Sequence, residues 1–207
     1  MDPTDGIERE TERSIVPSVM LGLVVVVAAI ALILSGEPGA PPVVRGAVAP
    51  DFELPFLGAD SPADATGAGI PAPGETLALS SLVGRVVLVN FWATWCEPCE
   101  REMPAMERLY AAIPREKFEL VAVAIDDTSS DVQAFQDRYQ LSFPILLDLD
   151  QQIYQSYQTM GVPESLLIDR DGRIVERYVG PRAWDDAEYV ERIRALIAGS
   201  GVSGGES

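Results

Sequence analysis

The stretch that decides the fold runs from Arg85 to Cys99 and reads RVVLVNFWATWCEPC. Its first part, residues 85–92, is β-branched and apolar, which is typical of a strand buried on both faces of a sheet. Its second part ends in Cys96 and Cys99, and apolar residues then recur at helical spacing as far as Ile113. The sequence therefore predicts a strand, a turn and a helix, with both cysteines on the first helical turn.

This placement gives the two cysteines a redox chemistry. Thiols three residues apart on one turn can close a disulfide, and the unpaired N–H groups and dipole at a helix start lower the pKa of the first thiol below its free value of about 8.5. We predict Cys96 as the nucleophile and Cys99 as the thiol that resolves the mixed disulfide. The alternative, a purely structural disulfide, closes so short a loop that it stabilises little. The pair itself is the redox group, and we expect no further cofactor.

Strands and helices alternate along the rest of the chain. They are a strand at residues 118–125, a helix at 129–140 capped by Ser129 or Ser130, a strand at 144–149, a helix at 151–158, strands at 165–168 and 174–179 around a turn at 169–172, and a helix at 185–198. Alternation that ends in a hairpin and a last helix predicts an α/β fold, a mixed sheet with helices on both faces.

The N-terminal part of the chain contains an uncharged apolar stretch, residues 15–34. About 20 residues at a rise of about 1.5 Å suffice to cross a bilayer core of about 30 Å, so we expect a transmembrane anchor. A cleaved signal is the alternative, although its apolar region is shorter, about 7–15 residues. Because Arg9 and Arg13 precede the stretch and the next basic residue is Arg45, the N-terminus should lie in the cytoplasm and the domain outside.

The expected organisation follows from these signals. A loop rich in glycine and proline is expected at residues 58–74. The segments are a cytoplasmic tail at 1–14, the anchor at 15–34, a Pro/Gly-rich tether at 35–48, the α/β domain at 49–198 and a flexible tail at 199–207.

Composition excludes several classes of function. The chain has two cysteines and no histidine, too few ligands for a closed four-ligand zinc or iron–sulfur site and no usual base for a hydrolytic triad. The formal net charge of -17 opposes binding to a phosphate backbone. We therefore expect no metal and no nucleic-acid partner.

The residues around the cysteines also resemble a known family. The segment VNFWATWCEPC at residues 89–99, followed by Glu102-Met-Pro104, resembles the active site of membrane-anchored thioredoxin-like thiol-disulfide oxidoreductases of the TlpA and ResA type. The likeness covers residues 49–198. It implies a thioredoxin fold with an N-terminal strand or hairpin extension and an inserted αβ element. It also implies a domain facing the periplasm or cell exterior, electrons from a transmembrane thiol carrier of the CcdA or DsbD kind, and reduction of apocytochrome c in cytochrome c maturation.

The resemblance also assigns roles to individual residues. Pro163 resembles the cis-proline that faces the disulfide in thioredoxin folds, and a cis bond there would expose the backbone of Val162 to an extended substrate. With Trp95 and Pro98, these two are the expected substrate-binding residues.

A proton acceptor for Cys99 is expected nearby. Asn90 stands where cytoplasmic thioredoxins carry a buried aspartate, and an amide cannot accept a proton at neutral pH. Glu102 resembles the glutamate that handles the proton of the buried thiol, which makes it the third expected catalytic residue. A plain surface glutamate is the other interpretation of Glu102, and Glu97 and Glu100 remain alternative bases.

Two other functions are alternatives for a chain with this pattern. A thiol peroxidase of the peroxiredoxin type needs a threonine three residues before its nucleophile, where this chain has Ala93. A non-catalytic module that only holds an extended peptide would show no reversible dithiol in a redox titration. Whether the protein reduces or oxidises its substrate is left open by the sequence and depends on its reduction potential.

Overall fold

The computed structural model describes residues 20, 22–27, 42–58, 75–126 and 128–199. The chain separates into two compact units, residues 1–41 and 42–207. In the first unit, residues 20 and 22–27 are helical. The predicted tail at 1–14, most of the predicted anchor at 15–34, the first part of the tether, most of the loop at 58–74 and nearly all of the tail at 199–207 lie outside the described residues. No helix within those described ranges has the length and apolarity to cross a membrane.

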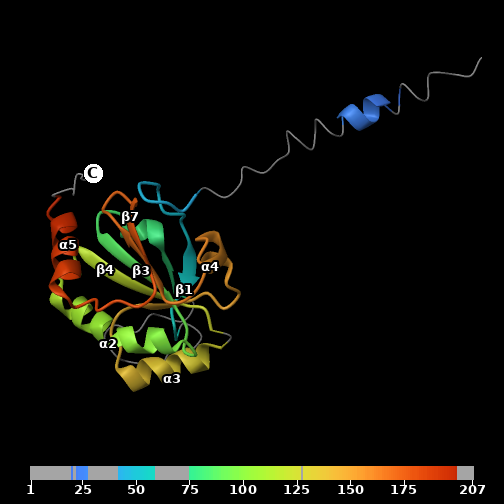
Figure 1. Cartoon of the computed structure of the whole chain (residues 1–207). Helices are drawn as coiled ribbons and strands as arrows, with labels where there is room; N and C mark the ends of the chain where they lie inside the picture. The colour runs from blue at the N-terminus through green and yellow to red at the C-terminus, as the bar shows by residue number, and fades with distance from the viewer. Residues whose placement is uncertain (1–19, 21, 28–41, 59–74, 127, 200–207) are drawn as a thin grey trace, which may run out of the picture. The chain divides into compact units, whose positions relative to one another are not determined.

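The second unit is built on a mixed five-stranded sheet with the order β5-β4-β3-β6-β7 (Figure 1). Its strands are β3 (Val86–Trp92), β4 (Phe118–Ala124), β5 (Ile145–Leu147), β6 (Glu164–Ile168) and β7 (Ile174–Val179). β3 is the central strand, parallel to β4 and antiparallel to β6. Every residue of β3 and β4 is buried, which explains why their sequences are apolar apart from Asn90 and Glu119.

Helices and loops cover both faces of this sheet. The helices are α2 (Glu97–Ala112), α3 (Ser129–Tyr139), α4 (Gln152–Ser156) and α5 (Ala187–Ile197). Successive side chains of a strand point to opposite faces. Thus Asn90 of β3 meets α2 through Glu102, whereas its neighbour Phe91 packs on Tyr157 at the end of α4. The predicted mixed sheet with helices on both faces is confirmed.

A hairpin precedes the main sheet. β1 (Glu53–Pro55) pairs antiparallel with β2 (Thr76–Ala78), and a 3₁₀ helix, η1 (Leu79–Leu82), follows. An isolated bridge between Phe56 and Leu146 ties this hairpin to β5. The N-terminal extension expected from the resemblance is therefore present, and the segment predicted as a loop begins three residues after the end of β1.

Two local predictions are corrected by the structure. Thr128, not Ser129 or Ser130, caps α3: its hydroxyl accepts from the backbone N–H of Asp131 at 3.3 Å. The helix predicted at 151–158 is shorter because Gln151 and Gln158 adopt left-handed backbone, φ 57° and 53°, which a right-handed helix cannot contain. The predicted turn at residues 169–172 is confirmed, with φ +76° at Gly172.

Candidate active site

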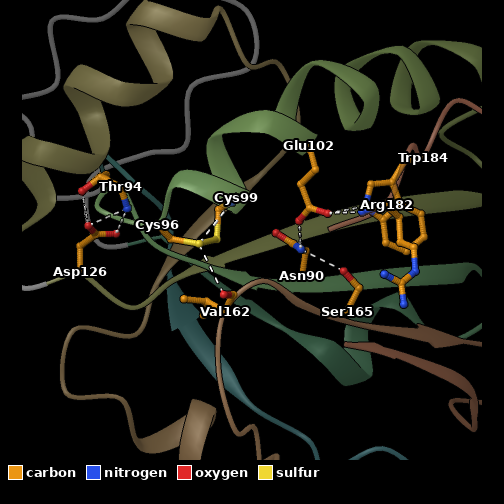
Figure 2. The surroundings of a disulfide bond; sticks show 10 residues. All are labelled: Asn90, Thr94, Cys96, Cys99, Glu102, Asp126, Val162, Ser165, Arg182 and Trp184. Atoms are coloured by element: carbon orange, nitrogen blue, oxygen red, sulfur yellow. Dashed lines mark hydrogen bonds between the residues drawn. A yellow bond between two sulfur atoms is a disulfide. The ribbon is translucent and has the colours of Figure 1, made fainter. Parts of the chain in front are cut away.

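The two cysteines lie where β3 has ended and α2 begins, as the sequence predicts. Cys96 is the N-cap residue of α2, and its sulfur accepts a hydrogen bond from the backbone N–H of Cys99 at 3.2 Å. The two residues are joined by a disulfide, with their Cα atoms 5.2 Å apart (Figure 2). The backbone N–H of Cys99 at the helix start thus faces the sulfur of Cys96, which favours its thiolate after reduction.

The two sulfurs differ in their access to solvent. Cys96 is 5% exposed and Cys99 is fully buried. The neighbouring Trp95 is 66% exposed, and Pro98 is half-buried on the first turn of the helix. Of the two cysteines, only Cys96 has any exposed area, and it follows a large exposed apolar side chain.

The loop before β6 faces this sulfur. The peptide bond between Val162 and Pro163 is cis, as predicted. The carbonyl oxygen of Val162 lies 3.5 Å from the sulfur of Cys96. A disulfide sulfur has no hydrogen to donate, so this is a close contact in the oxidised protein and becomes available as a hydrogen bond when Cys96 is a thiol. The structure therefore brings Cys96, Val162 and Pro163 together.

An ion pair between a buried carboxylate and a half-buried arginine holds that loop in place. Glu164 follows the cis-proline and its side chain is 1% exposed, and it binds the guanidinium of Arg177 on β7. Its other oxygen accepts the backbone N–H of Met160 at 3.2 Å. Arg177 also donates to the carbonyl oxygens of Tyr157, at 2.8 Å, and Gln158, at 3.1 Å. Sequence reasoning missed this pair, because only the β6–β7 pairing brings the two side chains together.

A second buried carboxylate holds the turn that precedes Cys96. Asp126, 2% exposed, follows β4 and accepts the backbone N–H of Thr94 at 2.9 and 3.1 Å as well as its hydroxyl. Thr94 lies two residues before Cys96, so Asp126 fixes the turn that carries the nucleophile. Sequence reasoning missed this residue too, although the aspartates that directly follow a buried apolar strand, Asp126 and Asp127, are a signal for it.

Glu102 is buried, at 2% exposure, one helical turn beyond Cys99. Three N–H groups bind its carboxylate: Asn90 Nδ2 at 3.0 Å on Oε1, and the backbone N of Arg182 at 3.0 Å and the indole of Trp184 at 3.1 Å on Oε2. Burial raises the pKa of Glu102 from 4.5 to about 7, against the opposing effect of these donors. The interpretation of Glu102 as a plain surface residue is wrong.

The two alternative bases, Glu97 and Glu100, bind other side chains. Glu97 is exposed and pairs with Arg101 at 2.5 Å, while Glu100 binds Arg138 at 3.5 Å and the hydroxyl of Tyr139. Figure 2 shows the carboxylate of Glu102 turned toward Asn90 and Trp184, with Asn90 drawn between it and the cysteines. Of the three glutamates near the cysteines, Glu102 is the buried one with a pKa close to neutrality.

The comparisons with known proteins agree with this geometry. Residues 45–177 match the AhpC/TSA family. The chain belongs to this family. Among curated relatives, the thiol-disulfide oxidoreductase ResA of Geobacillus kaustophilus is 34% identical over 153 residues, which are 73% of this chain and 79% of the relative. ResA of Halalkalibacterium halodurans is 42% identical over 124 residues, 60% of this chain and 69% of the relative.

A solved structure extends the agreement to the fold. A crystal structure described as a putative thiol:disulfide interchange protein DsbE from Chlorobium tepidum has 32% identity and a TM-score of 0.62, covering 74% of this chain and 98% of that one. The fold of this AhpC/TSA family member is thioredoxin-like, and the protein is a thiol-disulfide oxidoreductase related to ResA.

Proposed function

We propose that this protein is a membrane-tethered reductant of disulfides in exported polypeptides, acting outside the cytoplasmic membrane. The observation that carries the proposal is the contact between the sulfur of Cys96 and the carbonyl of Val162, next to the cis-proline. An extended substrate segment can pair with backbone at that position. Trp95, 66% exposed, and Met160, 88% exposed, provide apolar surface on the two loops that meet there.

The reaction follows from the order of the sulfurs. The thiolate of Cys96 attacks a substrate disulfide, forms a mixed disulfide and releases one substrate thiolate. Cys99 then loses its proton and attacks the sulfur of Cys96. This step restores the Cys96–Cys99 disulfide and releases the second substrate sulfur, so two electrons pass from the protein to the substrate. A dithiol donor must reduce the pair again.

Glu102 is proposed as the group that takes the proton of Cys99. Burial raises the pKa of a thiol, so at neutral pH Cys99 needs a base to become a nucleophile. Glu102 has a pKa of about 7, which suits a base that is reprotonated and deprotonated near neutral pH. No direct contact joins it to Cys99 in the oxidised protein, so the transfer passes through water or a side-chain movement that follows reduction.

The proposed partners come from the resemblance. They are apocytochrome c as the substrate, a transmembrane thiol carrier of the CcdA or DsbD kind as the electron donor, and the membrane through residues 15–34. The net charge of -17 favours encounter with basic polypeptides and disfavours acidic ones.

The reduction potential tests the proposed direction. We expect a value at or below that of thioredoxin, about -270 mV, and catalysed reduction of a peptide that carries a C-x-x-C disulfide. A potential near that of DsbA, about -120 mV, would instead assign an oxidant. Protease added to spheroplasts tests the location: it should digest the domain while residues 15–34 remain in the membrane fraction, whereas a soluble mature form would indicate a cleaved signal.

A further inference from the structure

The side chain of Asn90 contains an acceptor that nothing in the oxidised protein uses. Asn90 is fully buried at the centre of β3. Its Nδ2 donates to Oε1 of Glu102 at 3.0 Å and to Oγ of Ser165 at 2.9 Å. Within the part of the chain that the structure describes, its Oδ1 has no hydrogen-bond partner. Since buried carbonyl oxygens nearly always accept a hydrogen bond, we expect this oxygen to have a donor in another state of the protein.

The orientation of the amide is set by its surroundings. A flipped amide would place Oδ1 against the carboxylate of Glu102, where two acceptors would repel each other. While Glu102 is ionised, the NH₂ group therefore faces Glu102 and also donates to Ser165, and the oxygen faces the other way. Figure 2 shows that oxygen on the side of the disulfide, between Cys99 and Glu102. Cys99 and Glu102 are three residues apart on α2, so their side chains lie on one side of that helix, above Asn90.

We propose that Oδ1 of Asn90 accepts a hydrogen bond from the thiol of Cys99 in the reduced protein, which makes Asn90 a positioning residue. The proposal rests on the dithiol–disulfide cycle described above. A dithiol that reduces the protein breaks the Cys96–Cys99 bond and becomes a disulfide itself. It supplies two electrons, and together with solvent it supplies two protons. The sulfur of Cys99 then carries a hydrogen, so the missing donor exists only after reduction.

This hydrogen bond has two consequences. It stabilises the thiol of Cys99 over its thiolate, and it stabilises the reduced protein over the oxidised one. It also links Cys99 to Glu102 through one amide group. An ionised Glu102 polarises the NH₂ group and makes Oδ1 a stronger acceptor.

Several charged groups surround this amide and contribute to its titration. On the α2 face of the sheet they are Glu102, Arg182 before α5, Asp126 after β4 and the two cysteines. The paired Glu164 and Arg177 lie on the opposite face, because Glu164 stands opposite Phe91 and not opposite Asn90. A variant of Asn90 therefore needs a control that changes the donors to Glu102 and leaves Oδ1 in place. Trp184→Phe is that control, because the indole donates to Oε2 of the same carboxylate.

The test measures the S–H stretching band of Cys99 by infrared spectroscopy in the full-length reduced protein, with Cys96→Ala so that one thiol remains. We expect a band at lower wavenumber than that of a free thiol. Asn90→Ala, or Asn90→Val where the smaller side chain does not fold, should move it to the free position, and Trp184→Phe should leave it shifted. A free-thiol band in Cys96→Ala alone overturns the proposal without any further variant.

An equilibrium measurement supplies the magnitude. With both cysteines present, Asn90→Ala should lower the equilibrium constant for reduction by dithiothreitol about fivefold more than Trp184→Phe does, which is the effect of one neutral hydrogen bond. Equal effects in the two variants would mean that Asn90 acts only through Glu102 and would overturn the proposal. Both measurements concern Cys99 and Asn90 alone, so they can succeed where the proposed substrate or direction fails.

Discussion

The two sulfurs of the disulfide are bonded to each other but lie in very different surroundings. Cys96 reaches the surface, meets the carbonyl of Val162 and neighbours the exposed Trp95. Cys99 is fully buried on the side where α2, which carries Glu102, packs over Asn90. In the proposed mechanism the two sides divide the work: exchange with a partner belongs to the Cys96 side, and control of the proton belongs to the Cys99 side.

The two sides are also supported differently. The Cys96 side consists of two loops, and a buried carboxylate holds each of them: Asp126 binds the turn at Thr94, and Glu164 with Arg177 holds the loop before Pro163. On the Cys99 side, α2 and β3 position the groups directly. Loops that meet a substrate need such supports, because few backbone bonds of their own hold them.

Removal of each sulfur should give the largest effects and separate the two sides. Cys96→Ala should reduce disulfide exchange to the uncatalysed rate, because the nucleophile is gone. Cys99→Ser should instead accumulate mixed disulfides through Cys96, which non-reducing gels and mass spectrometry detect. If Cys96→Ser trapped substrate on Cys99 equally well, the assignment of the two roles would be wrong.

Loss of the support on the Cys96 side should cost stability. Arg177→Ala leaves the carboxylate of Glu164 buried without its cation, and we expect a loss of about 3–5 kcal/mol in the free energy of unfolding, measured with urea. Arg101→Ala is the matched control: its ion pair with Glu97 is exposed and should contribute less than about 1 kcal/mol. Glu164→Gln in the Arg177→Ala background should recover part of the loss, and no recovery would contradict the explanation by an unpaired charge.

Glu102 should make the stability of the oxidised protein depend on pH. Its pKa is 4.5 in the unfolded chain and about 7 in the fold, so the folded state binds the extra proton between these values. Stability from this group is therefore present at pH 4.5 and lost as pH rises to 7, by about 3 kcal/mol. Relative to Glu102→Gln, the wild type should become less stable across this window. A constant difference between the two would contradict the raised pKa.

The same variant should slow exchange. If Glu102 accepts the proton of Cys99, Glu102→Gln should reduce the rate of the resolving step about a hundredfold and change its pH profile. Glu102→Asp, which keeps a carboxylate, should restore part of the rate, and Glu100→Gln should leave the profile unchanged. An unaltered rate between pH 6 and 9 would remove Glu102 from the mechanism.

The smallest expected effect concerns the surface beside Cys96. Trp95→Ala should raise the KM for a disulfide-containing peptide about tenfold with little change in kcat, because an exposed aromatic contributes contact area to the bound segment. Unfolding by urea should be nearly unchanged, since the side chain is 66% exposed. A fall in kcat at constant KM would show that Trp95 acts on the cysteines and not on binding.

Much of this architecture is encoded locally. The continuous apolar runs that become β3 and β4, the helical spacing after Cys96 and the turn at residues 169–172 all predicted elements that the structure contains. The errors were at the ends of elements, as at Thr128 and Gln151, where one backbone conformation decides the boundary. The cis bond before Pro163 was predicted from the resemblance and is present.

The sequence by itself determined the chemistry: two cysteines on the first turn of a helix that follows a buried strand define a dithiol with one outer and one inner sulfur. Only the tertiary structure decided the surroundings of that dithiol. Trp184 and Arg182 reach Glu102 across about eighty positions of chain, and Asp126 reaches Thr94 across thirty-two. Periodicity records which face of an element is buried, but the partner of a buried polar group depends on how distant elements pack, which no local pattern contains.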